Sequence, residues 1–331
     1  MADFMGEIEE IPLNVCGIID NKFVIIAPID DSIDRDYMIY HVYDAKNPDT
    51  LYYAYIPRND VVPDRSINSL SATVRVLEKV KGRSKHFPKL IKYGKLPNLI
   101  FGMEQEQQME RDPEWIGRPV VIVQHDTVNL ASILCLSPNG CAPLILALHV
   151  GMGLVRALAA LHRAGFLLRL VSPHSFSCQN VVTLENLASS LLITDLSIAI
   201  PWPSKPRPYV PFVGTLRYSS VRAHSGREQC PADDIISVIY MIAEMVSGRL
   251  PWRSVFDEKR VKQQKATFFT ALEFKKLPQE IRLLYKMMHT NEPHSQLNYQ
   301  EILGFFQKAI ERKDPDSKFQ LPHWLFTSAG D

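Results

Sequence analysis

Residues 214–224 read GTLRYSSVRAH, and residues 233–252 read DDIISVIYMIAEMVSGRLPW. The second stretch contains an apolar run over 235–246 that is long enough for a buried helix, which ends near Gly248. Upstream of it, apolar residues recur at a near-i,i+4 spacing and predict a second buried helix. These residues are Leu146, Val150, Leu154, Leu158 and Leu161. Residues 281–288 and 299–310 have amphipathic patterns, so the chain after Pro143 is predicted to be mainly helical.

The N-terminal part has a different character. Three short runs rich in β-branched and aromatic residues predict strands over 23–29, 38–43 and 51–56. Apolar positions with helical spacing predict a helix over 68–80. Further strands are predicted over 90–93, 99–103 and 120–124. The order of elements therefore predicts an α+β fold in two lobes, with the boundary between Val123 and Leu130.

Composition excludes several classes of protein. The 331 residues carry 37 basic and 36 acidic side chains, a formal net charge of +1, which argues against a nucleic-acid binder. The five cysteines include no CxxC pair, so we expect neither a disulfide framework nor a zinc site. This indicates a reducing, intracellular location, in the cytoplasm with the nucleus left open. The acidic first ten residues do not resemble a signal peptide.

The most apolar window, residues 143–166, is interrupted by charged and polar side chains. These are His149, Arg156, His162 and Arg163. The window therefore predicts a buried helix of a folded domain, and we expect no association with a membrane.

Residues 214–252 closely resemble the end of the activation segment and the following buried helix of the casein kinase 1 superfamily. The preceding stretch PRPYVPFV, residues 206–213, is most similar to the tau-tubulin kinase branch. The resemblance covers about residues 20–312 and implies a bilobal protein-kinase fold. It divides the chain into an N-terminal extension (1–20), an N-lobe (21–124), a C-lobe (125–312) and a C-terminal tail (313–331). A fold does not by itself imply activity, because activity depends on the residues of the site.

The implied ATP-binding positions lack the expected residue types. No glycine occurs between Gly17 and Gly82, whereas the family covers the ATP phosphates with a glycine-rich loop. The corresponding segment, residues 29–38, carries four aspartates instead. Ile56 stands at the position of the phosphate-binding lysine. The family pairs that lysine with a glutamate on the following helix, and Thr73 stands at this position to within one helical turn. The alternative is that Lys22 or Lys46 supplies the positive charge that this lysine would provide.

The implied catalytic loop is also altered. Residues 165–176 read GFLLRLVSPHSF and align without gaps to the family pattern GFLHRDIKPSNF. The alignment places Leu170 at the catalytic aspartate, Ser172 at the lysine and Ser175 at the metal-binding asparagine. Leucine has no lone pair and no titratable group, so it cannot act as a general base. Of the implied metal ligands, Asp195 alone is kept, and it is a weak magnesium site without phosphates to bridge.

Positions that support the fold have residue types similar to those of the family, in contrast to the positions implied to be catalytic. Leu168 and Leu196 replace the histidine and phenylalanine that pack in the kinase interior, and both remain apolar. Other positions match the family and are predicted to be structural: Arg169, Gly214, Thr215, Arg217, Tyr218 and Asp234.

Basic residues are concentrated in two segments. The first contains Arg75, Lys79, Lys81, Arg83 and Lys85, and the second contains Lys259, Arg260, Lys262 and Lys265. A solvated surface is the simpler interpretation of the first segment. The alternative is a docking patch for an acidic or phosphorylated protein.

Three functions follow as hypotheses. The leading one is a catalytically inactive kinase-like protein that binds other proteins as a scaffold or regulator in signalling. The second is a weakly active or atypical serine/threonine kinase that still binds ATP. The third is a structural protein that recognises acidic or phosphorylated chains through the basic segments. We expect no cofactor under the first hypothesis, and ATP with magnesium under the second. The oligomeric state stays open.

Overall fold

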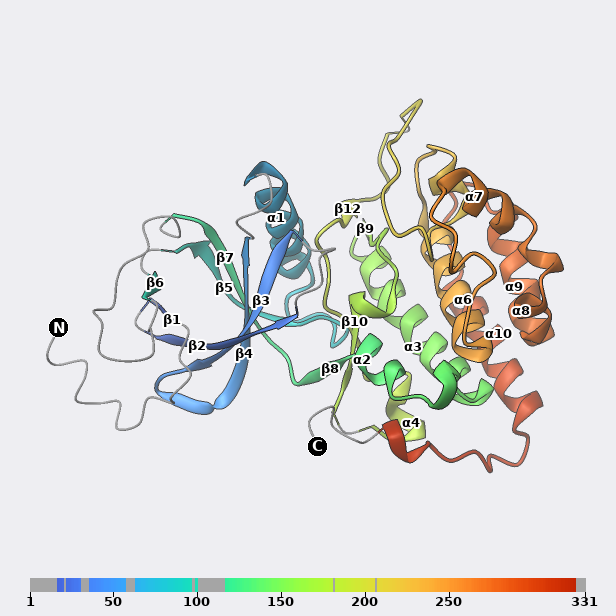
Figure 1. Cartoon of the computed structure of the whole chain (residues 1–331), viewed down its shortest axis with the longest axis horizontal. Coiled ribbons are helices and arrows are strands. Elements are labelled where there is room, and N and C mark those ends of the chain that lie inside the picture. Colours follow the sequence, from blue (N-terminus) through green and yellow to red (C-terminus); the bar gives the residue numbers. More distant parts are fainter. Residues whose placement is uncertain are drawn as a thin grey trace, which may run out of the picture. The chain divides into compact units, whose positions relative to one another are not determined.

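A seven-stranded antiparallel sheet organises the N-terminal unit in the computed structural model (Figure 1). The structure describes residues 17–20, 22–30, 36–57, 63–96, 99–100, 117–180, 182–205 and 207–325. The strand order in the sheet is β5-β7-β4-β3-β2-β1-β6. The strands are β1 (Gly17–Ile19), β2 (Phe23–Asp30), β3 (Tyr37–Asp44), β4 (Asn47–Pro57), β5 (Lys89–Lys95), β6 (Leu99–Ile100) and β7 (Pro119–Gln124).

The alternation of side chains along these strands builds one hydrophobic core. Aliphatic residues of β2, β3, β4 and β7 pack together with less than about a tenth of each side chain exposed. Helix α1 (Pro63–Val80) contacts β4, β5 and β7 and buries Leu70, Val76, Leu77 and Val80. Together with the buried Thr73, these positions recur every three or four residues, which is the helical period.

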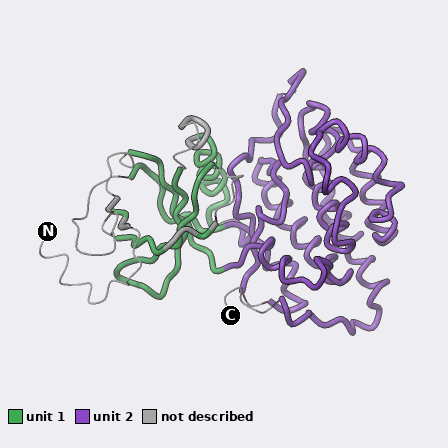
Figure 2. The backbone as a smooth tube through the Cα atoms, in the orientation of Figure 1, with its two compact units in different colours: residues 1–82, 88–126 green, residues 83–87, 127–331 purple. Residues whose placement is uncertain are grey.

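The second compact unit comprises residues 83–87 and 127–331 and is mainly helical (Figure 2). Its longer helices are α3 (Leu144–Arg163), α6 (Pro231–Ser247), α7 (Glu258–Ala266), α9 (Gln279–Thr290) and α10 (Tyr299–Lys313). Shorter ones are α2 (Leu130–Cys135), α4 (Leu184–Leu187), α5 (Val221–His224) and α8 (Leu272–Lys276). Five short strands form two small sheets: β8 (Thr127–Asn129), β9 (Phe166–Leu167), β10 (Phe176–Gln179), β11 (Leu191–Ile193) and β12 (Ile200–Pro201). Four 3-10 turns complete the list: η1 (Pro138–Gly140), η2 (Pro173–Ser175), η3 (Phe268–Thr270) and η4 (His323–Leu325).

Helix α3 is the centre of this unit and contacts both α6 and α10. It is long and apolar enough to cross a membrane, but 78% of its most apolar window is buried inside the protein. Gly151 allows the close packing, because a Cβ added there would lie 2.5 Å from Ile242 Cδ1 and 2.7 Å from Phe306 Cε1. Helix α3 is therefore a core helix, as the sequence predicted.

The predicted α+β class and bilobal kinase architecture are confirmed, with a β-rich N-terminal unit and a helical C-terminal unit. The helix predicted to start at residue 68 already begins at Pro63. The strand predicted over 99–103 is described only at Leu99–Ile100, and the rest lies outside the described residues. In the C-terminal stretch predicted to be a tail, η4 buries Trp324.

Candidate functional site

The loop that follows β9 corresponds to the implied catalytic loop, and Asp234 of α6 holds its backbone. Asp234 Oδ2 accepts a hydrogen bond from Leu168 N at 3.0 Å, and Oδ1 accepts one from Arg169 N at 3.0 Å. Arg169 has a φ of 63°, in the left-handed region that side-chain-bearing residues rarely adopt. That conformation costs about 1–2 kcal/mol, so the carboxylate offsets a local strain.

His162 and Tyr299 extend this contact into a network that joins α3, α6 and α10. His162 Nε2 lies 2.8 Å from Asp234 Oδ2, and His162 Nδ1 contacts the Tyr299 hydroxyl. Because an ionised carboxylate only accepts, Nε2 carries the proton and Nδ1 accepts from the phenol. Burial, followed by the charge of Asp234, raises the pKa of Tyr299. The sequence patterns did not single out either residue as part of this network.

The Arg169 side chain turns toward the segment after Asp195. Its Nε and Nη2 donate to the Ile198 carbonyl at 2.9 and 2.5 Å. Burial lowers the pKa of Arg169, and the negative charge of Asp234 counteracts part of this effect. Arg169 therefore connects the loop to the chain around Ile198.

The three positions implied to do chemistry carry no suitable groups. Leu170 is partly buried and has an aliphatic side chain. The hydroxyls of Ser172 and Ser175 are 3.1 Å apart and hydrogen-bonded to each other, and both residues are buried. An alkyl group thus stands at the position implied for the base. Two hydroxyls that are hydrogen-bonded to each other stand at the positions implied for the lysine and the metal ligand.

Asp195 is buried and takes part in its own turn. Its Oδ1 accepts from Ser197 N at 3.0 Å, while its backbone N–H donates to Ser175 O at 3.3 Å. Within the described ranges, no group of three or more histidine, cysteine or acidic residues is placed to hold a metal ion. One carboxylate beside a serine pair is an incomplete ligand set for magnesium, which needs near-octahedral oxygen ligation.

In the N-terminal unit, the implied lysine and glutamate positions are apolar or neutral. Ile56 on β4 is 1% exposed and packs in the core cluster that includes Val42 and Ala54. Thr73 on α1 is buried, and its hydroxyl donates to Ser69 O at 3.1 Å. The implied ion pair has no charged member at these positions. Residues 31–35 of the glycine-free segment lie outside the described residues.

Lys22 and Lys46, the alternative sources of positive charge, lie in different environments. Lys22 Nζ forms an ion pair with Asp44 Oδ2 at 3.3 Å, and Lys46 is exposed. On α1, Glu78 is exposed and accepts from the Tyr93 hydroxyl at 2.7 Å.

Thr215, Arg217 and Tyr218, which the sequence predicts to be structural, form with the neighbouring Gly214 a local scaffold held together by hydrogen bonds and an ion pair. Gly214 has a φ of 127°, and a Cβ there would lie 2.2 Å from Ser219 Oγ, so this position requires glycine. Thr215 Oγ1 accepts from Tyr218 N at 3.1 Å, and the Tyr218 hydroxyl donates to Glu244 at 2.5 Å.

Arg217 joins the same cluster. Its Nε lies 3.6 Å from Glu244 Oε1, and its carbonyl accepts from Trp252 Nε1 at 2.7 Å. Arg217, Tyr218 and Glu244 line a cavity of about 230 Å³ together with Pro173 and His174, which belong to the catalytic loop.

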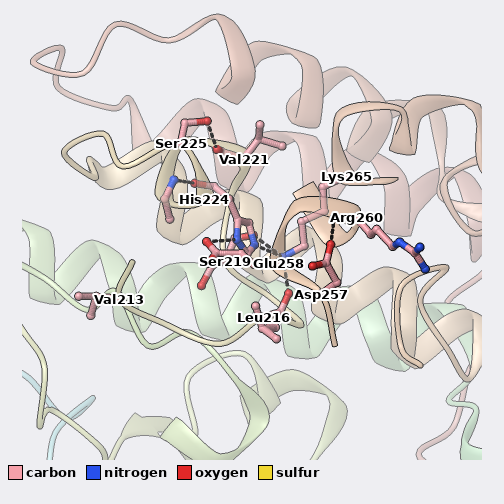
Figure 3. A network of polar contacts seen from close by, with 12 residues as sticks. Val213, Leu216, Ser219, Val221, His224, Ser225, Asp257, Glu258, Arg260 and Lys265 are labelled. Carbon is pink, nitrogen blue, oxygen red and sulfur yellow. Dashed lines mark hydrogen bonds and ion pairs between the residues drawn. The ribbon is translucent and has the colours of Figure 1, made fainter. Parts of the chain in front are cut away.

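Lys265 on α7 is buried beneath this scaffold (Figure 3). Its ammonium donates to Leu216 O and Ser219 O at 2.6 Å each, and lies 3.1 Å from His224 Nε2. All three polar contacts of this group lie inside the protein, where burial lowers the pKa of Lys265 well below its ordinary value. Lys265 was expected to help recognise acidic or phosphorylated chains as part of a basic run, and this is wrong for Lys265, because its side chain is buried. Lys259 and Arg260 of the same run are exposed.

His224 connects this network to Glu258, whose side chain is partly exposed. Its Nδ1 lies 3.2 Å from Glu258 Oε1, and Phe212 stacks on its ring at a centroid distance of 4.6 Å. Burial, with the nearby charge of Lys265, lowers the pKa of His224 to about 4. The neutral ring accepts from Lys265 and donates to Glu258, which fixes its tautomer.

The predicted docking residues are all exposed. Arg75 and Lys79 lie on α1, and Lys81 follows it; Arg83 and Lys85 belong to the second unit.

Comparison with known proteins gives modest but consistent similarities. A protein named as a casein kinase I from Caenorhabditis elegans is 29% identical over 194 residues, which is 55% of this chain and 56% of the relative. The serine/threonine-protein kinase spe-6 of the same organism is 36% identical over 115 residues, 33% of this chain and 29% of the relative. A protein named as a serine/threonine kinase from Dictyostelium discoideum is 26% identical over 155 residues, 46% of this chain and 31% of the relative.

The matched segments thus span between 29% and 56% of the length of these relatives. No protein-family profile matches the chain. With the two units described above, these similarities to serine/threonine and casein kinase 1-like kinases support a protein kinase family for this chain.

Proposed function

We propose that this protein is a catalytically inactive member of the casein kinase 1 superfamily, closest to the tau-tubulin kinase branch, which binds other proteins as a scaffold or regulator in signalling. The observation that carries the proposal is the catalytic loop, where Leu170 replaces the base and Ser172 and Ser175 are bonded to each other. We place the protein inside the cell, in the cytoplasm or nucleus, without a cofactor and without nucleic-acid or membrane ligands.

The expected loss of reaction rate favours an inactive protein over one with reduced kinase activity. Loss of a positioned general base lowers a rate by about 10²–10⁴. From a kinase turnover of about 1–100 per second, loss of the base alone would leave about 10⁻⁴ to 1 event per second, as little as one event in roughly three hours. The phosphate lysine and the metal-binding asparagine are replaced in addition, by Ile56 and Ser175. These effects do not add simply, but they act on separate parts of the reaction.

The retained framework supports a binding role. Asp234, Arg169 and Tyr218 still form the hydrogen bonds that fix the loop and the scaffold beside it. A rigid surface of this kind can hold a partner without transferring phosphate. The exposed basic residues from Arg75 to Lys85 favour partners that are acidic or phosphorylated.

A second candidate function is a weakly active or atypical serine/threonine kinase that binds ATP. Two observations favour it: Asp195 is kept, and the catalytic-loop backbone is held by Asp234. This candidate requires magnesium and nucleotide to compete with the internal contacts of Asp195.

The two candidates differ in nucleotide binding. The test is the thermal unfolding of the purified protein with and without millimolar ATP, in magnesium, in manganese and in chelator. We expect no shift in Tm, since a ligand that does not bind the folded state cannot stabilise it. An increase in Tm that needs the metal and is lost in Asp195→Ala, but not in the exposed control Asp316→Ala, would establish the second candidate. Transfer of the γ-phosphate to a peptide would then measure its activity.

A further inference from the structure

A proline-rich segment follows β12, and nothing in the proposed function so far uses it. Residues 205–211 read KPRPYVP, so Pro208 and Pro211 form a PxxP pair, and Lys205 stands three residues before the first of these prolines. Residues 205 and 207–211, the described part of this stretch, belong to no helix or strand. Proline fixes φ near the value of polyproline II, an extended conformation with three residues per turn. In that conformation, residues spaced by three share one face of the segment.

One face of the segment carries the two prolines and the lysine. Lys205, Pro208 and Pro211 are all exposed. Within the described residues, no carboxylate forms an ion pair with Lys205. The exposed face therefore presents a positive charge followed by two pyrrolidine rings at a constant spacing of three residues.

The positions between them connect the segment to the rest of the second unit. Arg207 forms a two-point ion pair with Glu228, with Nε–Oε2 at 3.0 Å and Nη2–Oε1 at 2.9 Å. Val210 is buried, and its backbone N–H donates to Gly226 O at 2.9 Å. The Tyr209 ring packs on the same glycine, because a Cβ added to Gly226 would lie 2.6 Å from Tyr209 Cε2. A partner would thus meet a segment that these contacts already hold, which lowers the entropic cost of binding.

Exposed prolines in this arrangement fit one kind of binding surface. Domains of the SH3 type bind PxxP segments in grooves lined by aromatic side chains, and they exploit the low conformational entropy of polyproline II. The ammonium group of Lys205 on the same face is complementary to a carboxylate at one end of such a groove. The segment therefore combines the apolar groups that an aromatic groove binds with a charge that can set its direction.

We propose that residues 205–211 are a docking segment for a partner protein whose groove is lined by aromatic side chains and has an acidic group at the end that meets Lys205. The proposal rests on the protein-binding function above and names the kind of partner. Pro208 and Pro211 would fill the groove. Arg207 would keep its ion pair with Glu228 in the complex, because it belongs to the positions that contact the second unit.

The test is an array of purified SH3 domains probed with the full-length chain, with affinities measured by biolayer interferometry. We expect at least one domain to bind, and a synthetic peptide of residues 203–213 to compete. The double variant Pro208→Ala/Pro211→Ala should bind about tenfold or more weakly, since each change removes two ring methylenes from the contact. Lys205→Glu should weaken binding by a similar factor and reverse its dependence on salt. Pro315→Ala, at an exposed proline outside the segment, is the matched control.

Absence of binding to every SH3 domain, or binding that the proline double variant leaves unchanged, would overturn the docking-segment proposal. Thermal unfolding of each variant establishes that a loss of binding does not come from a loss of the fold. Acidic peptides on the same array separate this failure from that of the proposed function. Binding of those peptides that the double variant does not change would remove the docking segment and leave a protein-binding role standing. A metal-dependent increase in Tm with ATP would count against the proposed function whatever the SH3 domains do.

Discussion

The Asp234 carboxylate accepts the backbone N–H of Arg169 at 3.0 Å, and Arg169 is held there with a φ of 63°. The same carboxylate also receives Leu168 N and His162, all in a site that is almost fully buried. The carboxylate thus holds the backbone of the loop, in which the positions implied to be catalytic carry Leu170, Ser172 and Ser175. This relationship fixes the backbone of the loop at Leu168 and Arg169.

Asp234→Asn should lower the free energy of unfolding by about 1.5–3 kcal/mol, because an amide cannot replace all three charge-assisted hydrogen bonds. Urea unfolding followed by circular dichroism measures the change. Asp316→Asn is the control, since its ion pair with Lys318 is exposed and a change within about 0.5 kcal/mol is expected. Equal stability of the two variants would contradict the role assigned to Asp234.

The sequence predicted those parts of the fold that depend on local pattern. The spacing of apolar residues predicted α3, α6, α9 and α10, and Leu168 and Leu196 are buried as expected. Contacts between distant residues were not predictable in this way. His162 and Tyr299 are 137 positions apart, and no local pattern marks them as partners.

The environment of Lys265 could not be inferred from the local excess of basic residues. A run of basic residues suggested a surface that recognises acidic chains, whereas one face of α7 is buried. Val261 lies four residues before Lys265 on the same helical face, and both are buried. That spacing is the signal that would have identified the lysine as internal.

Replacement of Lys265 by methionine should destabilise the protein by about 3 kcal/mol or more. The methionine fills a similar volume but leaves the carbonyls of Leu216 and Ser219 and the ring of His224 without a donor. Lys259→Met on the exposed face of α7 is the matched control, with little change expected. Comparable urea midpoints for the two variants would show that the network in Figure 3 does not contribute to stability.

The low pKa of His224 makes stability depend on pH. The group has a pKa of about 4 when folded and 6.5 as its ordinary value, so the unfolded chain binds more protons between these values. Stability is therefore fully present above about pH 6.5 and falls as the pH drops toward 4, by at most about 1.4 kcal/mol per pH unit. His224→Gln should remove this contribution.

Urea unfolding at pH 7, 6 and 5 measures the difference in slope between wild type and His224→Gln. The comparison is needed because burial also lowers the pKa of His125 to about 4, and that residue is present in both proteins. His323→Gln, at an exposed position in η4, controls for the loss of a histidine. The interpretation fails if His224→Gln keeps the wild-type pH dependence.

Ile56→Lys should destabilise the N-terminal unit by at least about 3 kcal/mol rather than restore a phosphate-binding lysine. The side chain is 1% exposed among aliphatic neighbours, where an unpaired ammonium loses its hydration. Ile56→Val removes one methylene and should cost about 0.5–1.5 kcal/mol. A variant with lysine at this position and wild-type stability would show that the site has access to water, and would strengthen the second candidate function.

Gly151→Ala and Gly304→Ala form a pair in which the same change has opposite effects. Both glycines are helical, and alanine favours a helix by about 0.8–1.0 kcal/mol. At Gly304 no atom lies within 4 Å of an added Cβ, so the variant should be stabilised by up to that amount. At Gly151 the Cβ would lie 2.5 Å from Ile242 Cδ1, and forcing α3 and α6 apart should cost about 1–3 kcal/mol. Urea unfolding decides the signs, and a stabilised Gly151→Ala variant would mean that the core of the second unit is packed less tightly than its helix contacts indicate.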